Sequence, residues 1–258
     1  MLTRPKKIRA DLLVVEQGLA ETRTRAQALI MAGQILLAQG AVVQKPGDQL
    51  PDDAVLYLRG EPPRFVSRAG GKLQAIFDHF GVTPQDAVCL DVGQSTGGFT
   101  DCLLQAGAAR VYGVDVGYGQ LHWRLRADPR VVVIERENIR TLAEDALPEP
   151  ADWLVVDVSF ISLGLVLPSA IRFLKDDAYV GLLIKPQFEV GAKQVGKGGI
   201  VRDEAARDGA TLRVKGFCAA SNIEVIGVIP SPVIGSKGNQ EFLLLGRREK
   251  ELSSLNLI

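Results

Sequence analysis

Short apolar runs rich in Val, Ile and Leu alternate with helix-like segments from residue 87 onward. The runs are AVCLDVG (87–93), RVYGVDV (110–116), VVVIER (131–136), DWLVVDV (152–158), AYVGLLIK (178–185), IEVIGVIP (223–230) and EFLLLGRR (241–248). Helical patterns such as GGFTDCLLQAG, LGLVLPSAIRFL and DEAARDGATLRVKGFCAAS lie between most of them. This alternation predicts a doubly wound α/β sheet. Only SPVIGSKGN separates the last two runs, so we expect the final strand to be antiparallel.

The first 60 residues follow another pattern. Apolar positions over residues 9–37 recur at helical spacing and predict two short helices. Gly18 is placed to end the first helix, Thr22 to cap the second, and Gly33 to end it. Two β-like pieces, QILLAQGAVV and VLYLRG, follow and are joined by the turn-rich QKPGDQLPDD. We expect a small α+β domain at 1–60, a proline-containing linker at 61–66 and a larger α/β domain at 67–258.

Composition narrows the class of protein. The chain has 258 residues, 47% of them hydrophobic, with 30 basic and 30 acidic side chains. Overall charge therefore predicts neither nucleic-acid nor membrane binding, although basic side chains outnumber acidic ones over the first 30 residues. The three cysteines are far apart and read as reduced core residues rather than metal ligands. No signal peptide or membrane-spanning stretch is apparent, so a soluble cytoplasmic protein is expected.

A glycine-rich turn, CLDVGQSTGGFT (89–100), joins the first run to a helix start. Dinucleotide binding would require G-x-G-x-x-G, but Ser95 interrupts that pattern. A P-loop would require lysine after Gly98, where this chain has Phe99. The sequence D-x-G-x-x-x-G-G-F, followed by Asp115 at the end of the second run, instead resembles S-adenosylmethionine (SAM)-dependent methyltransferases.

That resemblance implies that Asp91 meets the SAM ammonium group and that Asp115 holds its ribose hydroxyls. Asn138, after the third run, is a candidate for contact with the adenine. The candidate cofactor-binding residues are Asp91, Gly93, Ser95, Thr96, Gly97, Gly98, Phe99, Asp115, Val116, Asn138 and Asp157.

Charged residues occur where buried strands should end. Lys185 closes an apolar run, Asp157 lies within the run LVVDVSF and Glu241 opens the last run. Lys72 lies on the helical segment before the sheet. Strand ends at the carboxyl edge of an open α/β sheet converge, so we expect Asp157 and Lys185 to lie close together. Two buried salt bridges are one interpretation, although such pairs seldom stabilise a protein more than apolar side chains would.

The other interpretation is a catalytic K-D-K-E tetrad, because this region resembles the RrmJ/FtsJ-like RNA ribose 2′-O-methyltransferases. A ribose hydroxyl is a poor nucleophile at neutral pH, and a lysine amine could accept or orient its proton. The resemblance implies that Lys185 activates the hydroxyl and Asp157 orients Lys185. Lys72 and Glu241 would complete the array, and no metal is implied.

The N-terminal pattern R-x-D-L-L-V-x-x-G-L-A-x-[ST]-R-x-x-A-x-x-L-I-x-x-G, read over residues 9–33, resembles the S4 RNA-binding domain. In that family two helices present arginines to structured RNA. The resemblance implies that Arg9, Arg23 and Arg25 meet phosphates, with salt-dependent affinity.

An S4 domain fused to an RrmJ-like methyltransferase resembles the TlyA, or haemolysin A-like, family. Segments that carry the resemblance include RFVSRAGGKL, LDVGQSTGGFTD, DVSFISL, LIKPQFE, KGGIVRD and SPVIGSKGNQEFLL. It implies 2′-O-methylation of cytidine in ribosomal RNA of the small subunit or of both, with rRNA or ribosomal subunits as partners. The further RNA-contact candidates are Arg64, Arg68, Lys193, Lys197 and Arg202. The loop VGAKQVGKGGIVRD would close on RNA, or it is an ordinary solvated loop.

Two other functions compete with this interpretation. The older family name suggests a membrane-damaging haemolysin, which the sequence disfavours because it shows no secretion signal, membrane span or amphipathic cationic helix. A non-catalytic, SAM-responsive rRNA-binding or ribosome assembly factor is the other, and the intact lysine and acid set disfavours it.

Overall fold

The computed structural model describes residues 7–60, 63–235 and 238–250. The chain divides into two compact units, residues 1–68 and 69–258. Glu61 and Pro62, part of the expected linker, lie outside the described residues, as do Arg4 and Lys6 of the basic N-terminal segment.

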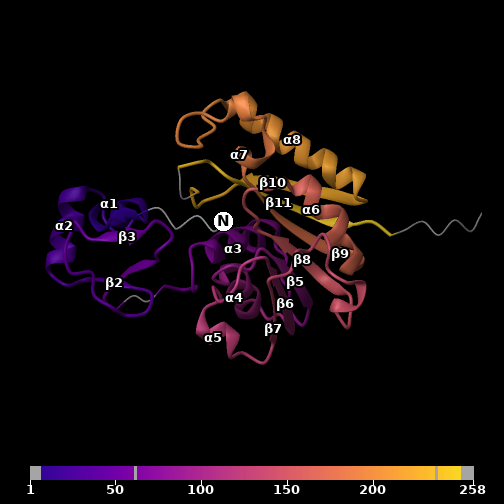
Figure 1. Cartoon of the computed structure of the whole chain (residues 1–258), viewed down its shortest axis with the longest axis horizontal. Helices are drawn as coiled ribbons and strands as arrows, with labels where there is room; N and C mark the ends of the chain where they lie inside the picture. The colour runs from indigo at the N-terminus through magenta and orange to yellow at the C-terminus, as the bar shows by residue number, and fades with distance from the viewer. Residues whose placement is uncertain (1–6, 61–62, 236–237, 251–258) are drawn as a thin grey trace, which may run out of the picture. The chain divides into compact units, whose positions relative to one another are not determined.

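The first unit packs two helices, α1 (Ala10–Glu16) and α2 (Arg23–Met31), with two small antiparallel strand pairs (Figure 1). Strand β1 (Lys7–Arg9) pairs with β3 (Gln49–Pro51), and β2 (Ile35–Leu37) pairs with β4 (Leu56–Leu58). The expected cap of the second helix is confirmed, because the Thr22 hydroxyl accepts a hydrogen bond from the Arg25 N–H at 3.2 Å. Buried Leu, Val and Ile side chains from α1, α2, β2 and β4 form the core of this unit.

One expectation for this unit was wrong. The segment QKPGDQLPDD, expected to be a turn, contains strand β3. Its partner β1 lies some forty residues earlier, and such long-range pairing leaves no local apolar pattern.

The second unit is built on a seven-stranded sheet in the order β10-β11-β9-β8-β5-β6-β7. All seven expected strands are confirmed: β5 (Val88–Val92), β6 (Arg110–Asp115), β7 (Val131–Glu135), β8 (Ala151–Val156), β9 (Leu174–Ile184), β10 (Ile223–Pro230) and β11 (Phe242–Arg248). Strands β5 to β9 pair with one another in parallel, whereas β11 is antiparallel to both β9 and β10, as expected. The doubly wound α/β prediction is therefore confirmed.

Helices cover both faces of this sheet (Figure 1). They are α3 (Ala69–Phe80), α4 (Gly98–Gln105), α5 (Trp123–Arg126), α6 (Leu163–Ala170), α7 (Pro186–Glu189) and α8 (Glu204–Ala220), with 3-10 turns at Glu144–Ala146, Ile171–Phe173 and Ala192–Gln194. Helix α3 packs on α4 and β11, while α8 packs on β10, α6 and α7. Cys89, Cys102 and Cys218 are buried free thiols within this core.

Three of the candidate catalytic side chains lie next to strand ends. Asp157 was expected inside its strand, but β8 ends at Val156, so Asp157 is the first residue beyond the carboxyl end. Lys185 likewise follows β9, and Glu241 precedes β11 rather than opening it. Because Phe242 pairs with Ile184 in antiparallel register, Glu241 and Lys185 lie at the same edge of the sheet. No helix of the described residues is long and apolar enough to cross a membrane.

Candidate active site

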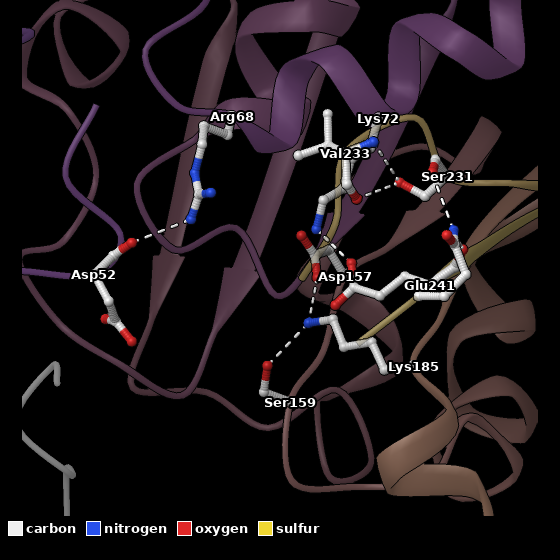
Figure 2. Close-up of polar contacts among 10 residues, drawn as sticks. Asp52, Arg68, Lys72, Asp157, Ser159, Lys185, Ser231, Val233 and Glu241 are labelled. Carbon is white, nitrogen blue, oxygen red and sulfur yellow. Dashed lines mark hydrogen bonds and ion pairs between the residues drawn. The ribbon is translucent and has the colours of Figure 1, made fainter. Parts of the chain in front are cut away.

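Lys185 and Asp157 form a close ion pair at the carboxyl edge of the parallel strands. The Lys185 Nζ lies 2.6 Å from Asp157 Oδ1, and the two side chains are only 11% and 17% exposed. The same Nζ donates a hydrogen bond to the Ser159 hydroxyl at 2.9 Å, as Figure 2 shows. The expected approach of Lys185 to Asp157 is thus present, together with a second partner that the sequence did not indicate.

Lys72 and Glu241 form a second pair beside the first (Figure 2). The Lys72 Nζ donates to Glu241 Oε2 at 2.6 Å, and these side chains are 11% and 4% exposed. A β-carbon at Gly235 would lie 2.5 Å from Glu241 Oε1, so only glycine leaves room for this carboxylate. The four residues therefore make two lysine–acid pairs, from helix α3 and from three strand ends.

The lysines of both pairs affect the pKa of Asp157. Burial alone would raise the pKa of Asp157, but the ammonium groups of Lys185 and Lys72 outweigh burial and hold that pKa below its usual value. Asp157 therefore remains a carboxylate at neutral pH and can act as a fixed negative charge beside Lys185.

Asp91, in β5, occupies a different environment. Its side chain is fully buried, and burial, with the nearby charges of Asp157 and Asp115, raises its pKa to about 7. Asp91 Oδ2 accepts a hydrogen bond from the Thr100 hydroxyl at 2.6 Å, and the Gln94 amide donates to that hydroxyl at 3.0 Å. Asp91 Oδ1 is buried with no hydrogen-bond partner among the described residues. Such an orphaned acceptor suits a ligand that brings its own donor.

The glycine-rich turn brings backbone close to the end of β8. Gly93 and Gly97 have φ values of 88° and 93°, a region that side chains disfavour. A β-carbon at Gly93 would lie 2.5 Å from the Asp157 carbonyl oxygen, which excludes other residues. Gly98 then begins α4, whose first N–H groups face the turn.

Asp115 braces the turn from β6. One carboxylate oxygen accepts from the Ser95 N–H at 2.7 Å and the other from the Gly117 N–H at 2.6 Å. The buried carboxyl of Asp91 disfavours a phosphate, whereas an ammonium group would complete its hydrogen bonding. These residues therefore fit SAM better than a nucleotide phosphate.

The remaining cofactor candidates differ in their exposure to solvent. Val116 is 71% exposed just beyond Asp115, and Asn138 is exposed, its side chain accepting from the Arg140 N–H. Thr96 accepts the His122 N–H through its carbonyl. The Phe99 ring is buried in the core, so only the backbone of Phe99 could meet a ligand.

The N-terminal arginine candidates surround a carboxylate that the sequence did not single out. Asp11 is fully buried and accepts hydrogen bonds from Arg9, Arg23 and Gln27, each near 2.9 Å. These bonds, led by that from Arg9, hold the Asp11 pKa well below its usual range. The arginine side chains themselves are 40% and 51% exposed, so Asp11 fixes two guanidinium groups at the surface. Arg25 is exposed nearby on α2.

The other RNA candidates are spread over both units. The Arg68 guanidinium donates to the Asp52 carbonyl at 3.1 Å (Figure 2), and Arg64 lies over the Phe65 ring. Lys193, Lys197 and Arg202 are exposed on the segment between α7 and α8. Asn239, just before Glu241, is buried and holds that segment through hydrogen bonds to Gly199 and Val201.

Several residues near the site escaped the sequence interpretation. Ser159, Thr100 and Gln94 are common polar residues, and only their contacts in the structure distinguish them from other polar residues of the chain. Phe160 is a sharper case, because its ring is 74% exposed, its φ is 65° and it packs against Phe188. No residue-type pattern marks an exposed aromatic of this kind in advance.

The sheet order, the glycine turn after β5 and the acids at adjacent strand ends define the second unit as a Rossmann-like methyltransferase. The sequence profile of the FtsJ-like methyltransferases matches residues 65–248. The chain belongs to the FtsJ-like methyltransferase family.

Relatives extend the likeness to nearly the whole chain. The 16S/23S rRNA (cytidine-2′-O)-methyltransferase TlyA of Mycobacterium tuberculosis is 42% identical over 95% of this chain and 92% of its own length. Hemolysin A of Brachyspira hyodysenteriae is 37% identical over 92% of this chain and 98% of its own. A candidate hemolysin of known structure from Streptococcus thermophilus is 40% identical, with a TM-score of 0.80 over 96% of this chain and 90% of that one.

Proposed function

We propose that this protein transfers a methyl group from SAM to the ribose 2′-hydroxyl of cytidine in ribosomal RNA. The observation that carries the proposal is the Lys185–Asp157 pair beside the glycine turn, with Lys72–Glu241 next to it. The name of the M. tuberculosis relative, which specifies cytidine 2′-O-methylation of 16S and 23S rRNA, supports the substrate.

Residues at the ends of β5 and β6 would hold the cofactor. Asp91 Oδ1 would accept a hydrogen bond from the ammonium group, and Asp115 would meet the ribose hydroxyls. The turn from Gly93 to Gly98 allows close backbone approach, with Val116 and Asn138 beside it. When bound, SAM supplies an electrophilic methyl group.

Lys185 is the residue that handles the substrate proton. A lysine nitrogen has up to three N–H directions, and Asp157 and Ser159 use two of them. The third remains for the ribose oxygen, which a neutral amine deprotonates as the oxygen becomes a nucleophile. Asp157 orients the amine and stabilises the ammonium that forms, while Lys72 and Glu241 set the surrounding charge.

RNA recognition belongs in part to the first unit, which we assign as an S4 RNA-binding domain at residues 1–60. A linker at 61–66 and the methyltransferase domain at 67–258 follow. Arg9 and Arg23, held by Asp11, present guanidinium groups suited to phosphates, and Arg25 adds a third. Arg64, Arg68, Lys193, Lys197 and Arg202 are the further candidates for contact with rRNA or a ribosomal subunit.

The test is methyl transfer from labelled SAM to ribosomal subunits and naked rRNA that lack the modification. Wild type, Lys185→Ala and Lys175→Ala would be compared, since Lys175 also pairs with an aspartate but at the opposite end of β9. The expected result is label on cytidine ribose with wild type and Lys175→Ala, and none with Lys185→Ala.

Two results would contradict the proposal. Label on a base would overturn the ribose assignment. Absence of label with wild type on every substrate, despite tight SAM and rRNA binding, would favour the non-catalytic assembly factor.

A further inference from the structure

The Lys185 side chain is largely, though not fully, withdrawn from solvent. Its side chain is 11% exposed and that of Asp157 is 17% exposed. The third member of the group, Ser159, is exposed, and its hydroxyl accepts the hydrogen bond from Lys185 at 2.9 Å. Ser159 therefore gives the half-buried Lys185 a hydrogen-bond partner at the surface.

The second lysine lacks such a neighbour. Within the described residues, the Lys72 amine donates its hydrogen bond to Glu241, whose side chain is 4% exposed. Both lysines are equally buried and equally close to an acid, so burial and pairing do not distinguish them. Of these two lysines, only Lys185 donates a hydrogen bond to an exposed hydroxyl among the residues that the structure describes.

The fold holds Ser159 in this place. Glu189, which is buried at the end of α7, accepts hydrogen bonds from the Ser162 hydroxyl at 2.6 Å and from the Leu163 N–H at 2.8 Å. Helix α7 begins directly after Lys185, and Ser162 caps α6 at the end of the segment that contains Ser159. One carboxylate thus ties the two segments whose side chains meet at the Lys185 nitrogen.

We propose that Ser159 is a positioning residue that connects Lys185 to solvent for proton transfer, an inference that rests on the proposed function. A lysine ammonium must lose a proton before its nitrogen can act as a base. Lys185 gives that proton to Ser159 Oγ, and the Ser159 hydroxyl releases its own proton to water. In the reaction the ribose O–H bond breaks and its proton goes to the neutral amine, while the oxygen bonds to the methyl group that SAM would supply and the methyl–sulfur bond breaks. The same path then returns Lys185 to the neutral state.

A lysine-detected NMR experiment tests the path without cofactor or RNA. Protein labelled with 15N-lysine reports the exchange of Nζ protons with water, and Lys185→Arg assigns the Lys185 signal. Ser159→Ala is expected to slow this exchange about fivefold, because a relay through a positioned hydroxyl is lost. Ser159→Thr, which keeps the hydroxyl, is expected to restore it. Lys175, paired with Asp152 Oδ1 at 2.7 Å, is the internal reference and is expected not to change.

Single-turnover methyl transfer gives the second readout. Ser159→Ala is expected to lower the rate about tenfold and to increase the solvent deuterium isotope effect, while SAM affinity stays unchanged. The rate loss is expected to be largest at low pH, where Lys185 must lose its proton first. Ser159→Thr is again expected to recover most of the rate.

Defined outcomes would overturn the inference. Exchange at Lys185 that is unchanged or faster in Ser159→Ala would show that the hydroxyl is no proton path. A rate loss that is equal at every pH and is not rescued by threonine would show that Ser159 only fills space. If wild type transfers no methyl group, the proposed function fails, and the exchange measurement still decides the role of Ser159.

Discussion

The two lysine–acid pairs of the site have the same chemistry and different surroundings. Each joins an Nζ to a carboxylate oxygen at 2.6 Å, and each lysine side chain is 11% exposed. Glu241 is 4% exposed and is packed against Gly235, whereas Asp157 is 17% exposed and its lysine reaches the exposed Ser159. We interpret the Lys72–Glu241 pair as fixed and the Lys185–Asp157 pair as the one that exchanges a proton.

The energetics of buried ion pairs concern both pairs alike. Buried ion pairs seldom stabilise a fold more than apolar side chains of similar volume, because desolvation offsets the attraction. Two such pairs at one sheet edge therefore point to chemistry rather than to stability. The positive charge of Lys72 lowers the pKa of Asp157 together with Lys185, so the fixed pair acts on the exchanging pair through its field.

The largest expected effect comes from removing the exchanging amine. Lys185→Met is expected to lower the single-turnover rate about 10³-fold, the middle of the range for a positioned acid–base group. Lys185→Arg is expected to be equally inactive, because a guanidinium does not lose its proton in proteins. Near-normal activity of either variant would remove Lys185 from the mechanism, and Lys175→Met serves as the matched control.

The fixed pair is expected to matter more for stability. Glu241→Ala leaves the Lys72 ammonium buried and unpaired, and is expected to lower the free energy of unfolding by about 3 kcal/mol. Asp157→Ala is expected to cost less, because Lys185 keeps Ser159 as a partner. Urea unfolding measures the free energy of unfolding of both variants. A larger loss of stability in Asp157→Ala than in Glu241→Ala would contradict the assignment of the fixed pair. The double variant Lys72→Met/Glu241→Leu is expected to recover stability.

A third acid, Asp91, extends the comparison because its Oδ1 has no hydrogen-bond partner within the part of the chain that the structure describes. Its raised pKa of about 7 means that the folded protein holds a proton there which the unfolded chain has lost, so stability falls as pH rises from the ordinary carboxyl range toward 7. SAM binding requires the carboxylate, so affinity is expected to rise by up to about tenfold per pH unit below pH 7 and then level off.

Calorimetric titration of wild type and Asp91→Asn at several pH values measures this dependence. The variant is expected to bind SAM weakly and without the pH dependence. Methylthioadenosine, which lacks the ammonium group, is the control ligand, and a pH-dependent affinity for it in wild type would contradict the assignment of Asp91.

The smallest expected effect concerns Asp11. This buried carboxylate orients two arginines, whereas Asp157 orients a lysine that we propose as the general base. Asp11→Asn weakens the hold on Arg9 and Arg23 and is expected to reduce rRNA affinity about threefold, with little change in the slope of affinity against salt. Arg23→Ala is expected to reduce that slope by about one, because a phosphate contact is lost. Filter binding over a salt series separates the effects of the two variants, and tighter binding by Asp11→Asn would contradict the positioning role.

Asp11 also contributes to the pH dependence of stability. Since the Asp11 pKa is lowered, the stability that Asp11 contributes is present above the ordinary carboxyl range and is lost as pH falls below it.

Much of this organisation could be predicted from sequence because it rests on local pattern. The seven strand runs are apolar and β-branched, and the antiparallel β11 follows from the short connection before it. Convergence of Asp157 and Lys185 follows from parallel strands that end at one edge. The capping of α2 by Thr22 is likewise a local effect.

What sequence could not supply was the choice of partners. Nothing in the order of residues says that Lys72 pairs with Glu241 while Lys185 pairs with Asp157, because that depends on side-chain reach across the sheet edge. Ser159 and Asp11 are common residue types whose roles appear only through contacts. Strand β3 is three residues long and is defined by its distant partner.

The central claim, that Lys185–Asp157 exchanges the proton and Lys72–Glu241 does not, is tested most directly by pH–rate profiles. Single-turnover rates of wild type, Asp157→Asn and Glu241→Gln would be measured across the pH range in which each variant is folded. Loss of the Asp157 charge makes the neutral Lys185 amine easier to form, so the rising limb is expected to move to lower pH. Glu241→Gln is expected to lower the whole profile with a much smaller displacement. A displaced limb in Glu241→Gln, with an unmoved one in Asp157→Asn, would contradict the account.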